Sequence, residues 1–179
     1  MKDLVLVDPR AQRARLFGEA IHVYRQRSSV VRAQAGPVRA AAGERQEHSS
    51  RLLRAMNRVA ADRCTVGDGE EVSLHVFQTV EPALEYLRAL PAGRRAVVFS
   101  DVYRHGTSLS GIDLVACMKR EAGLRCVPTV LLATDASELE IRKAWRAGCS
   151  AVVHLPLELP GMLVRVTDAV EFWFGTAAL

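Results

Sequence analysis

The chain has 179 residues, and its 49% hydrophobic content is enough to build the core of one domain. The formal net charge is +4, but residues 10–63 hold twelve arginines against four acidic residues, so that segment carries +8 and the remainder −4. This composition argues against a wholly disordered chain, and no apolar run approaches the roughly 20 residues that span a bilayer. With a charged start in place of a signal peptide, we expect a cytoplasmic protein without a membrane segment.

The chain begins with a predicted strand and a predicted helix. Residues 2–7 form an apolar run that ends on Asp8, and Pro9 is preset for a first helical turn. Apolar residues then recur at three- and four-residue spacing up to Tyr24, which indicates an amphipathic helix. We expect the arginines of this helix to lie largely outside: Arg10, Arg13 and Arg25.

A basic insertion, residues 27–68, separates this helix from the next predicted strand. Its Ala, Arg, Glu and Gln content favours a helix, and about forty residues are too many for a structureless loop in a compact domain. At about 100° per residue, three arginines lie opposite an apolar stripe that we expect to dock on the domain. The two faces are Arg51, Arg54 and Arg58, against Leu52, Met56, Val59 and Ala60.

The arginine face of the insertion is expected to attract an acidic protein partner. Nucleic acid is the alternative partner, but no aromatic residues are interleaved with these arginines, and solvated helix faces commonly have this composition. We therefore rank nucleic acid below a protein.

The rest of the chain alternates strand-like and helix-like segments. We expect strands at 72–77, 95–101, 128–132 and 150–155, and helices at 81–90, 111–122, 137–147 and 159–174. Parallel neighbours need crossover connections, so five strands alternating with helices predict a doubly wound parallel sheet of order 2-1-3-4-5. Residues 1–179 then form a single α/β domain.

Three of these strands bring polar side chains to one edge of the sheet. The third strand ends on Asp101, the first on Asp8, and the fourth on Ala133 and Thr134. Open parallel sheets bind their ligands at the carboxyl ends of the strands. This edge is therefore the candidate functional site.

Five segments occur in the order in which response-regulator receiver domains have them, and the sequence resembles that family outside roughly residues 27–68. The segments are Val-Leu-Val-Asp at 5–8, Val-Val-Phe-Ser-Asp at 97–101, Ser-Gly-Ile-Asp-Leu at 110–114, Val-Pro-Thr-Val-Leu-Leu-Ala-Thr at 127–134 and Arg-Ala-Gly-Cys-Ser-Ala-Val-Val-His-Leu-Pro at 146–156. The ending Val-Glu-Phe-Trp-Phe at 170–174 resembles the small receivers that serve phytochrome-type histidine kinases.

The resemblance implies a site for phosphoryl transfer to an aspartate. Asp101 matches the acceptor, and Asp8 matches the first of two acids that hold Mg²⁺; a hydroxyl and a lysine then contact the phosphoryl group. Four positions depart from the pattern: Pro9 replaces the second acid, Ala133 the hydroxyl residue, Val152 the aromatic residue and Leu155 the lysine. Thr134, next to Ala133, is the substitute hydroxyl if the register shifts.

These departures indicate a degenerate receiver, a pseudo-receiver, whose output is binding. We expect no enzymatic activity, no cofactor, and a protein partner such as a histidine kinase or another signalling protein. Two alternatives stay open: a weak phosphoacceptor in which Asp8 and Asp101 hold a water-rich Mg²⁺, and a nucleic-acid-binding regulator that uses the insertion. A metal site of His105 and His154 with Asp8 is less favoured, because side chains alternate along a strand and His154 points away if Leu155 faces the pocket.

The last segment, residues 159–179, is predicted to combine a helix with an aromatic end. Three large rings at a chain end favour an interface, so we expect a homodimer in which the last helix takes part together with Phe172, Trp173 and Phe174. Receivers turn sharply after their fifth strand, and the resemblance therefore implies a cis peptide bond between Leu155 and Pro156.

Overall fold

The computed structural model describes residues 2–8, 10–33, 72–91, 93–103 and 109–176, without side chains at 27–33 and 176. Within these ranges the strands are β1 (Lys2–Val7), β2 (Val72–Phe77), β3 (Arg95–Asp101), β4 (Thr129–Ala133) and β5 (Ala151–His154). They form one parallel sheet of order β2-β1-β3-β4-β5. The predicted fold class and strand order are confirmed.

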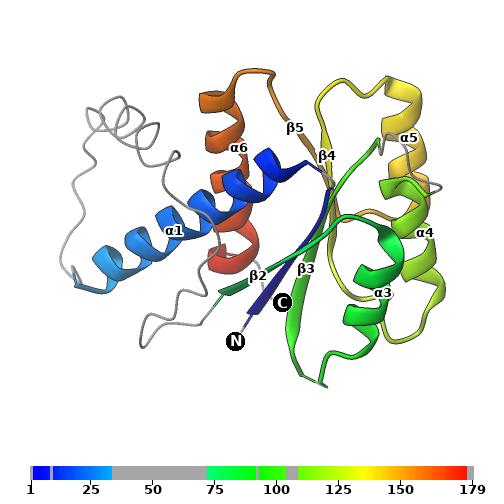
Figure 1. Cartoon of the computed structure of the whole chain (residues 1–179), viewed down its shortest axis with the longest axis horizontal. Coiled ribbons are helices and arrows are strands. Elements are labelled where there is room, and N and C mark those ends of the chain that lie inside the picture. The colour runs from blue at the N-terminus through cyan, green and yellow to red at the C-terminus, as the bar shows by residue number, and fades with distance from the viewer. Residues whose placement is uncertain (1, 9, 34–71, 92, 104–108, 177–179) are drawn as a thin grey trace.

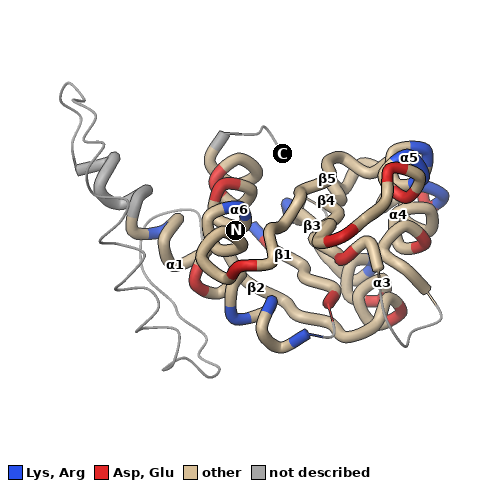
Figure 2. Tube along the Cα trace, turned by 90° about the horizontal axis from the view of Figure 1, so that it is seen from above, with Lys and Arg blue, Asp and Glu red and all other residues tan. Residues whose placement is uncertain are grey.

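Helices cover both faces of this sheet (Figure 1). Helices α1 (Ala11–Ala33) and α6 (Leu159–Glu171) pack on one face. Helices α3 (Val80–Arg88), α4 (Gly111–Arg120) and α5 (Glu138–Ala147) pack on the other, and the π-helical turn Phe172–Thr176 follows α6. Figure 2 shows that the charged residues of the described chain lie mostly on the helices and at strand ends.

The central strands β1, β3 and β4 are largely apolar because both faces of the sheet are buried there. Along β1, Leu4 and Leu6 belong to the core cluster beneath α1 and α6, whereas Val5 and Val7 belong to the cluster beneath α3 and α4. On the α1 side the Phe17 and Phe99 rings meet edge to face, with their centroids 4.9 Å apart. Each such side chain contributes roughly 1.5–3 kcal/mol when fully buried.

Local signals fix where α4 and α5 begin and where α5 ends. Ser110 caps α4 and Ser137 caps α5, each through a capping box. The serine hydroxyl accepts from the backbone N–H three residues later, and the side chain of that residue, Asp113 or Glu140, accepts from the backbone N–H of the serine. Gly148 ends α5 with φ of 93°, a left-handed conformation that favours glycine.

The aromatic end of the chain differs in part from the prediction. Phe172 is 52% exposed, as expected for a surface ring, and Trp173 is half-buried, but Phe174 is only 2% exposed. The backbone carbonyl of Phe174 accepts hydrogen bonds from Lys2 Nζ at 2.8 Å and from the Tyr24 hydroxyl at 2.9 Å. The wider π-helical turn directs the Phe174 ring into the core beside α1, so assigning Phe174 to an interaction surface was wrong.

The prediction of a cis peptide bond after β5 was also wrong. The described residues contain no cis peptide bond, so Leu155–Pro156 is trans. The Leu155 N–H donates to the Ala133 carbonyl at 2.8 Å, which extends the β4–β5 pairing one residue past the strand, and trans is the ordinary state of an X-Pro bond.

The basic insertion lies largely outside the described residues. Helix α1 continues through residues 27–33, where the sequence has no clear periodicity. The predicted docking stripe and the face of Arg51, Arg54 and Arg58 fall in residues 34–71 and stay predictions. None of the described helices is long and apolar enough to cross a membrane.

A buried carboxylate ties together the amino ends of β1, β2 and β3. Asp3 is fully buried and accepts hydrogen bonds from Arg94 Nε at 2.5 Å and Nη2 at 2.8 Å, and His75 Nε2 lies 3.1 Å from its Oδ1. The Tyr86 hydroxyl is 2.9 Å from the same His75 nitrogen. Burial alone would raise the pKa of Asp3, but Arg94, followed by His75, outweighs burial and lowers it.

The lowered pKa of Asp3 predicts a pH dependence of stability. A carboxyl group with a depressed folded-state pKa contributes its stability fully above its unfolded value of about 3.9 and loses that contribution as the pH falls through the folded value. We expect Asp3→Asn to cost about 2 kcal/mol at neutral pH and to flatten the acid limb of the stability curve, as measured by urea unfolding at several pH values. Arg94→Gln should flatten the same limb, and an acid limb unchanged in both variants would contradict this assignment.

Candidate functional site

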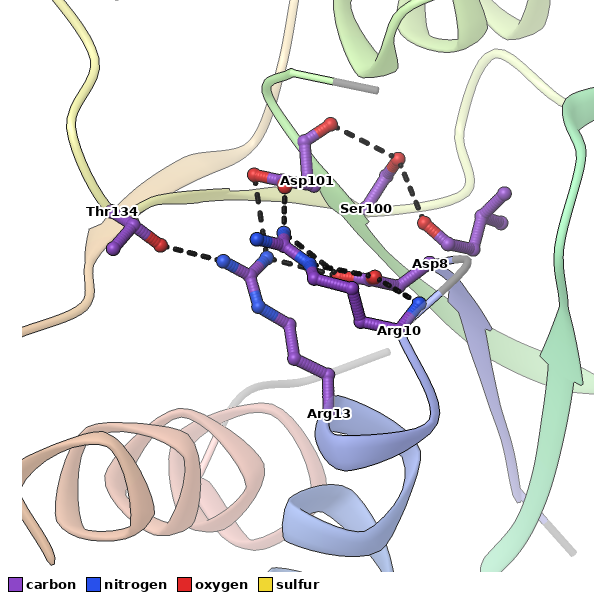
Figure 3. Close-up of polar contacts among 7 residues, drawn as sticks. Asp8, Arg10, Arg13, Ser100, Asp101 and Thr134 are labelled. Carbon is purple, nitrogen blue, oxygen red and sulfur yellow. Dashed lines mark hydrogen bonds and ion pairs between the residues drawn. The ribbon is translucent and has the colours of Figure 1, made fainter. Parts of the chain in front are cut away.

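A cluster of polar side chains lies at the carboxyl edge, where the receiver pattern has its acidic pocket, and we keep the name pocket for it. Its residues come from the ends of three neighbouring strands and the start of α1 (Figure 3). Asp8 follows β1 and is 1% exposed, and Asp101 ends β3 and is 5% exposed. The two strands pair directly, with Val7 opposite Ser100, so the carboxylates are delivered to adjacent positions. Thr134 follows β4, the next strand in the sheet.

Arg13 of α1 connects all three of these side chains. Its Nη1 lies 3.0 Å from Asp8 Oδ2 and 3.3 Å from Asp101 Oδ1, and its Nη2 donates to Thr134 Oγ1 at 2.6 Å. Its side chain is only 4% exposed. Burial lowers the pKa of Arg13 to about 10, a change that the Asp8 charge partly opposes, so the guanidinium remains charged at neutral pH.

Arg10 makes a second set of contacts to the same carboxylates. Its backbone N–H donates to Asp8 Oδ1 at 2.8 Å, its Nε donates to Asp8 Oδ1 at 3.1 Å, and its Nη2 contacts both Asp8 Oδ2 and Asp101 Oδ2. The side chain of Arg10 is 45% exposed, so it is the outer of the two arginines. Two guanidinium groups thus balance two carboxylates.

The prediction that these arginines lie outside was therefore wrong for Arg13 and incomplete for Arg10. Helical periodicity assigned them to the polar face of α1, but it takes no account of the carboxylates at the strand ends beside the first helical turn. The sequence does hold a usable signal, because arginines two and five residues after a strand-terminal aspartate lie in the helical turn nearest to it.

The positions at which the sequence departs from the receiver pattern lie mostly in the core. Leu155 is 3% exposed among the residues beneath α1 and α6, Ala133 is 1% exposed, and Val152 packs beside it. The hydroxyl that reaches the pocket belongs to Thr134 rather than to a residue at position 133. Pro9 lies outside the described residues.

The histidine alternative finds no support in the described geometry. His154 is exposed at the end of β5, and His105 lies outside the described residues. Among the residues that the structure describes, no group of three or more His, Cys, Asp or Glu side chains is arranged to hold a metal ion.

The described residues of the pocket do not fit the Mg²⁺ that the receiver pattern implies. Mg²⁺ needs carboxylate oxygens with free lone pairs and near-ideal octahedral geometry. Here both oxygens of Asp8 and both of Asp101 already contact guanidinium nitrogens, and two positive charges lie where a cation would bind. The arrangement is suited to holding strand ends and helix together rather than to metal-assisted chemistry.

Comparison with the sequences of known proteins does not establish a family for this chain. No family model matches the chain. A curated relative, the probable methanogenesis regulatory protein FilR2 of Methanothrix harundinacea, is 28% identical over 96 residues, which is 52% of this chain and 61% of that protein. The matched region therefore spans less than two thirds of the relative.

Solved structures of receivers align over almost the whole chain. The Mn²⁺-bound response regulator Rcp1 has a TM-score of 0.65 at 14% identity, covering 100% of this chain and 99% of that one. The phosphorylated cyanobacterial phytochrome response regulator RcpA has a TM-score of 0.66 at 18% identity, covering 99% of this chain and 97% of that one. RPA3017 of R. palustris, a response regulator in red light signaling, has a TM-score of 0.62 at 14% identity, covering 100% of this chain and 98% of that one. The chain has the receiver fold.

Gly111 sets the position of α4 relative to the pocket. A Cβ at this residue would overlap the Asp101 carbonyl oxygen, and it would lie 3.0 Å from the Asp101 carbonyl carbon and from Leu131 Cδ2. We expect Gly111→Ala to lower the unfolding free energy by about 2 kcal/mol, because backbone must move to remove the clash. Gly123→Ala, where a Cβ meets nothing within 4 Å, is the matched control for the same chemical-denaturation measurement. Equal stability of the two variants would contradict the close approach.

Proposed function

We propose that the chain is a pseudo-receiver, a receiver-fold module of two-component signalling or a related regulatory system that acts by binding other proteins. It neither catalyses a reaction nor depends on phosphorylation of Asp101, and it uses no metal cofactor. The signalling part of this proposal is supported by the receiver fold and by the roles of the compared proteins: a probable methanogenesis regulatory protein, a phytochrome response regulator and a response regulator in red light signaling.

One observation carries the phosphorylation-independent part: guanidinium groups contact both oxygens of Asp101. Attack of a carboxylate on a phosphoryl group requires the donor and a divalent cation to reach its oxygens, and a dianionic phosphoryl donor needs a cation that is not already neutralised. Arg10 and Arg13 are neutralised by Asp8 and Asp101 at 3.0–3.3 Å and by the shorter Arg10–Asp101 contact. The lysine expected at position 155 is replaced by a buried leucine.

The weak phosphoacceptor remains the second candidate, because Asp101 ends β3 at the acceptor position and Arg13 links it to the Thr134 hydroxyl. It demands that Arg10, which is 45% exposed, leaves the pocket to admit the donor and a cation. A nucleic-acid role through Arg51, Arg54 and Arg58 would rest on residues outside the described ranges, so we do not favour it over a protein partner.

A small phosphodonor distinguishes the first two candidates. We expect acetyl phosphate with Mg²⁺ to give no phosphoryl adduct in the intact mass spectrum, because both Asp101 oxygens are held by arginine. Asp101→Asn is the control for labelling elsewhere in the chain. A stable adduct on wild type that disappears in Asp101→Asn would establish the phosphoacceptor instead.

We further propose that the module forms a homodimer through the outer face of α6. Val164 of α6 is 53% exposed, and Phe172, directly after the helix, is 52% exposed. Leu157, two residues before α6, is 78% exposed. Large apolar side chains exposed along one helix and at its two ends favour packing on a partner. Phe174 is not part of this surface because it is buried within the chain.

The dimer proposal predicts a selective effect of charge on α6. Val164→Lys together with Phe172→Lys should convert a dimer to a monomer in sedimentation velocity at micromolar concentration, because burying two unpaired charges is unfavourable. Leu139→Lys is the matched control, since Leu139 is 60% exposed on α5. The proposal fails if wild type sediments as a monomer, or if Leu139→Lys dissociates a dimer that the α6 variant leaves intact.

A further inference from the structure

The two buried carboxylates of the pocket need a positive charge close to both of them. Asp8 and Asp101 are 1% and 5% exposed, and one nitrogen of Arg13 lies within 3.3 Å of both carboxylates. Two buried carboxylates at such short range repel each other unless a cation lies between them or one of them binds a proton. The position that balances both charges is occupied by Arg13, and Arg10 contacts both carboxylates from the more exposed side.

Arg13 does more than balance charge, because its two terminal nitrogens contact three strand ends. Nη1 contacts the residue after β1 and the last residue of β3, and Nη2 contacts the residue after β4. Its own backbone belongs to the first turns of α1. Thr134 is three residues before Ser137, the residue that caps α5, so the bond to Thr134 fixes the segment from which α5 starts.

We infer that Arg10 and Arg13 replace a divalent cation in this pocket, and that Arg13 permanently couples the acidic pair to the start of α5. The pocket is complete without any ion, since each carboxylate oxygen has a guanidinium partner and the Thr134 hydroxyl is bonded. The inference concerns the pocket alone and holds whether or not the chain acts in signalling.

The direct test is to remove the two guanidinium groups and supply a cation from solution. Arg10→Gln with Arg13→Met keeps much of the side-chain volume and leaves Asp8 and Asp101 without a counter-ion. We expect its thermal unfolding midpoint to fall and to rise again with millimolar Mg²⁺, while the midpoint of wild type is unaffected by Mg²⁺. A midpoint that depends on ligand concentration is the signature of binding to the folded state.

Two controls separate a cation site from a general salt effect. Asp101→Asn in the background of the double variant should abolish the Mg²⁺ response, because one carboxylate of the pair is lost. Arg15→Gln, at an exposed arginine of the same helix, should behave as wild type does. The inference is overturned if wild type gains as much stability from Mg²⁺ as the double variant gains, or if the folded double variant does not respond.

The coupling to α5 has its own readout. Thr134→Val removes the hydroxyl that accepts from Arg13 but preserves shape, and we expect amide hydrogen exchange at residues 135–137 to speed up by about tenfold, the effect of losing one charge-assisted bond. Arg13→Lys keeps the charge but loses the fork geometry. It should therefore show the same increase in hydrogen exchange at residues 135–137, with a smaller loss of overall stability than the Arg10→Gln/Arg13→Met double variant. If the double variant does not fold, Arg13→Lys still tests the coupling of the pocket to α5. Unchanged exchange at 135–137 in both variants would refute the coupling.

Discussion

The carboxyl edge of the sheet depends on the pairing of two buried carboxylates with arginine. Taking Asp8 and Asp101 out of water costs several kcal/mol each, and this cost is offset only where a counter-ion lies at hydrogen-bond distance. Arg13, with 4% of its side chain exposed, meets that requirement from within the chain. The first turns of α1, the ends of β1 and β3 and the loop after β4 are all positioned by this one charge cluster.

The rest of the fold directs side chains to that edge without depending on the cluster for its core. Residues on alternate sides of β1 enter separate apolar clusters beneath α1 with α6 and beneath α3 with α4, so the sheet is held on both faces. A second buried carboxylate, Asp3, ties the opposite ends of the strands through Arg94. Ion pairs thus hold the two ends of β1, and apolar contacts hold its middle.

Sequence patterns were sufficient for the sheet and for placing Asp8, Asp101 and Thr134 at one edge, but they missed the arginines that connect these three side chains. Apolar runs, capping serines and Gly148 mark elements through local chemistry, and the strand order follows from the alternation of strands and helices. The role of Arg10 depends on a strand end 91 residues further along the chain, and Arg13 contacts the same strand end. Helical periodicity contains no information about such a distant partner. Phe174 was misplaced because the prediction treated three large rings at the chain end as one surface, whereas the π-helical turn directs the Phe174 ring into the core.

Replacing an ion with arginine changes what such a pocket is able to sense. An ion from solution occupies a site in proportion to its concentration, so a metal-dependent pocket is conditional. A guanidinium on the same chain is present at a fixed effective concentration, and here it is held by carboxylates on two strands and by Thr134. The pocket of this chain therefore has one arrangement in which all charges are satisfied. Under the proposed function, regulation therefore acts on the outer surfaces of the domain, such as the exposed apolar side chains along α6, rather than on the edge of the sheet.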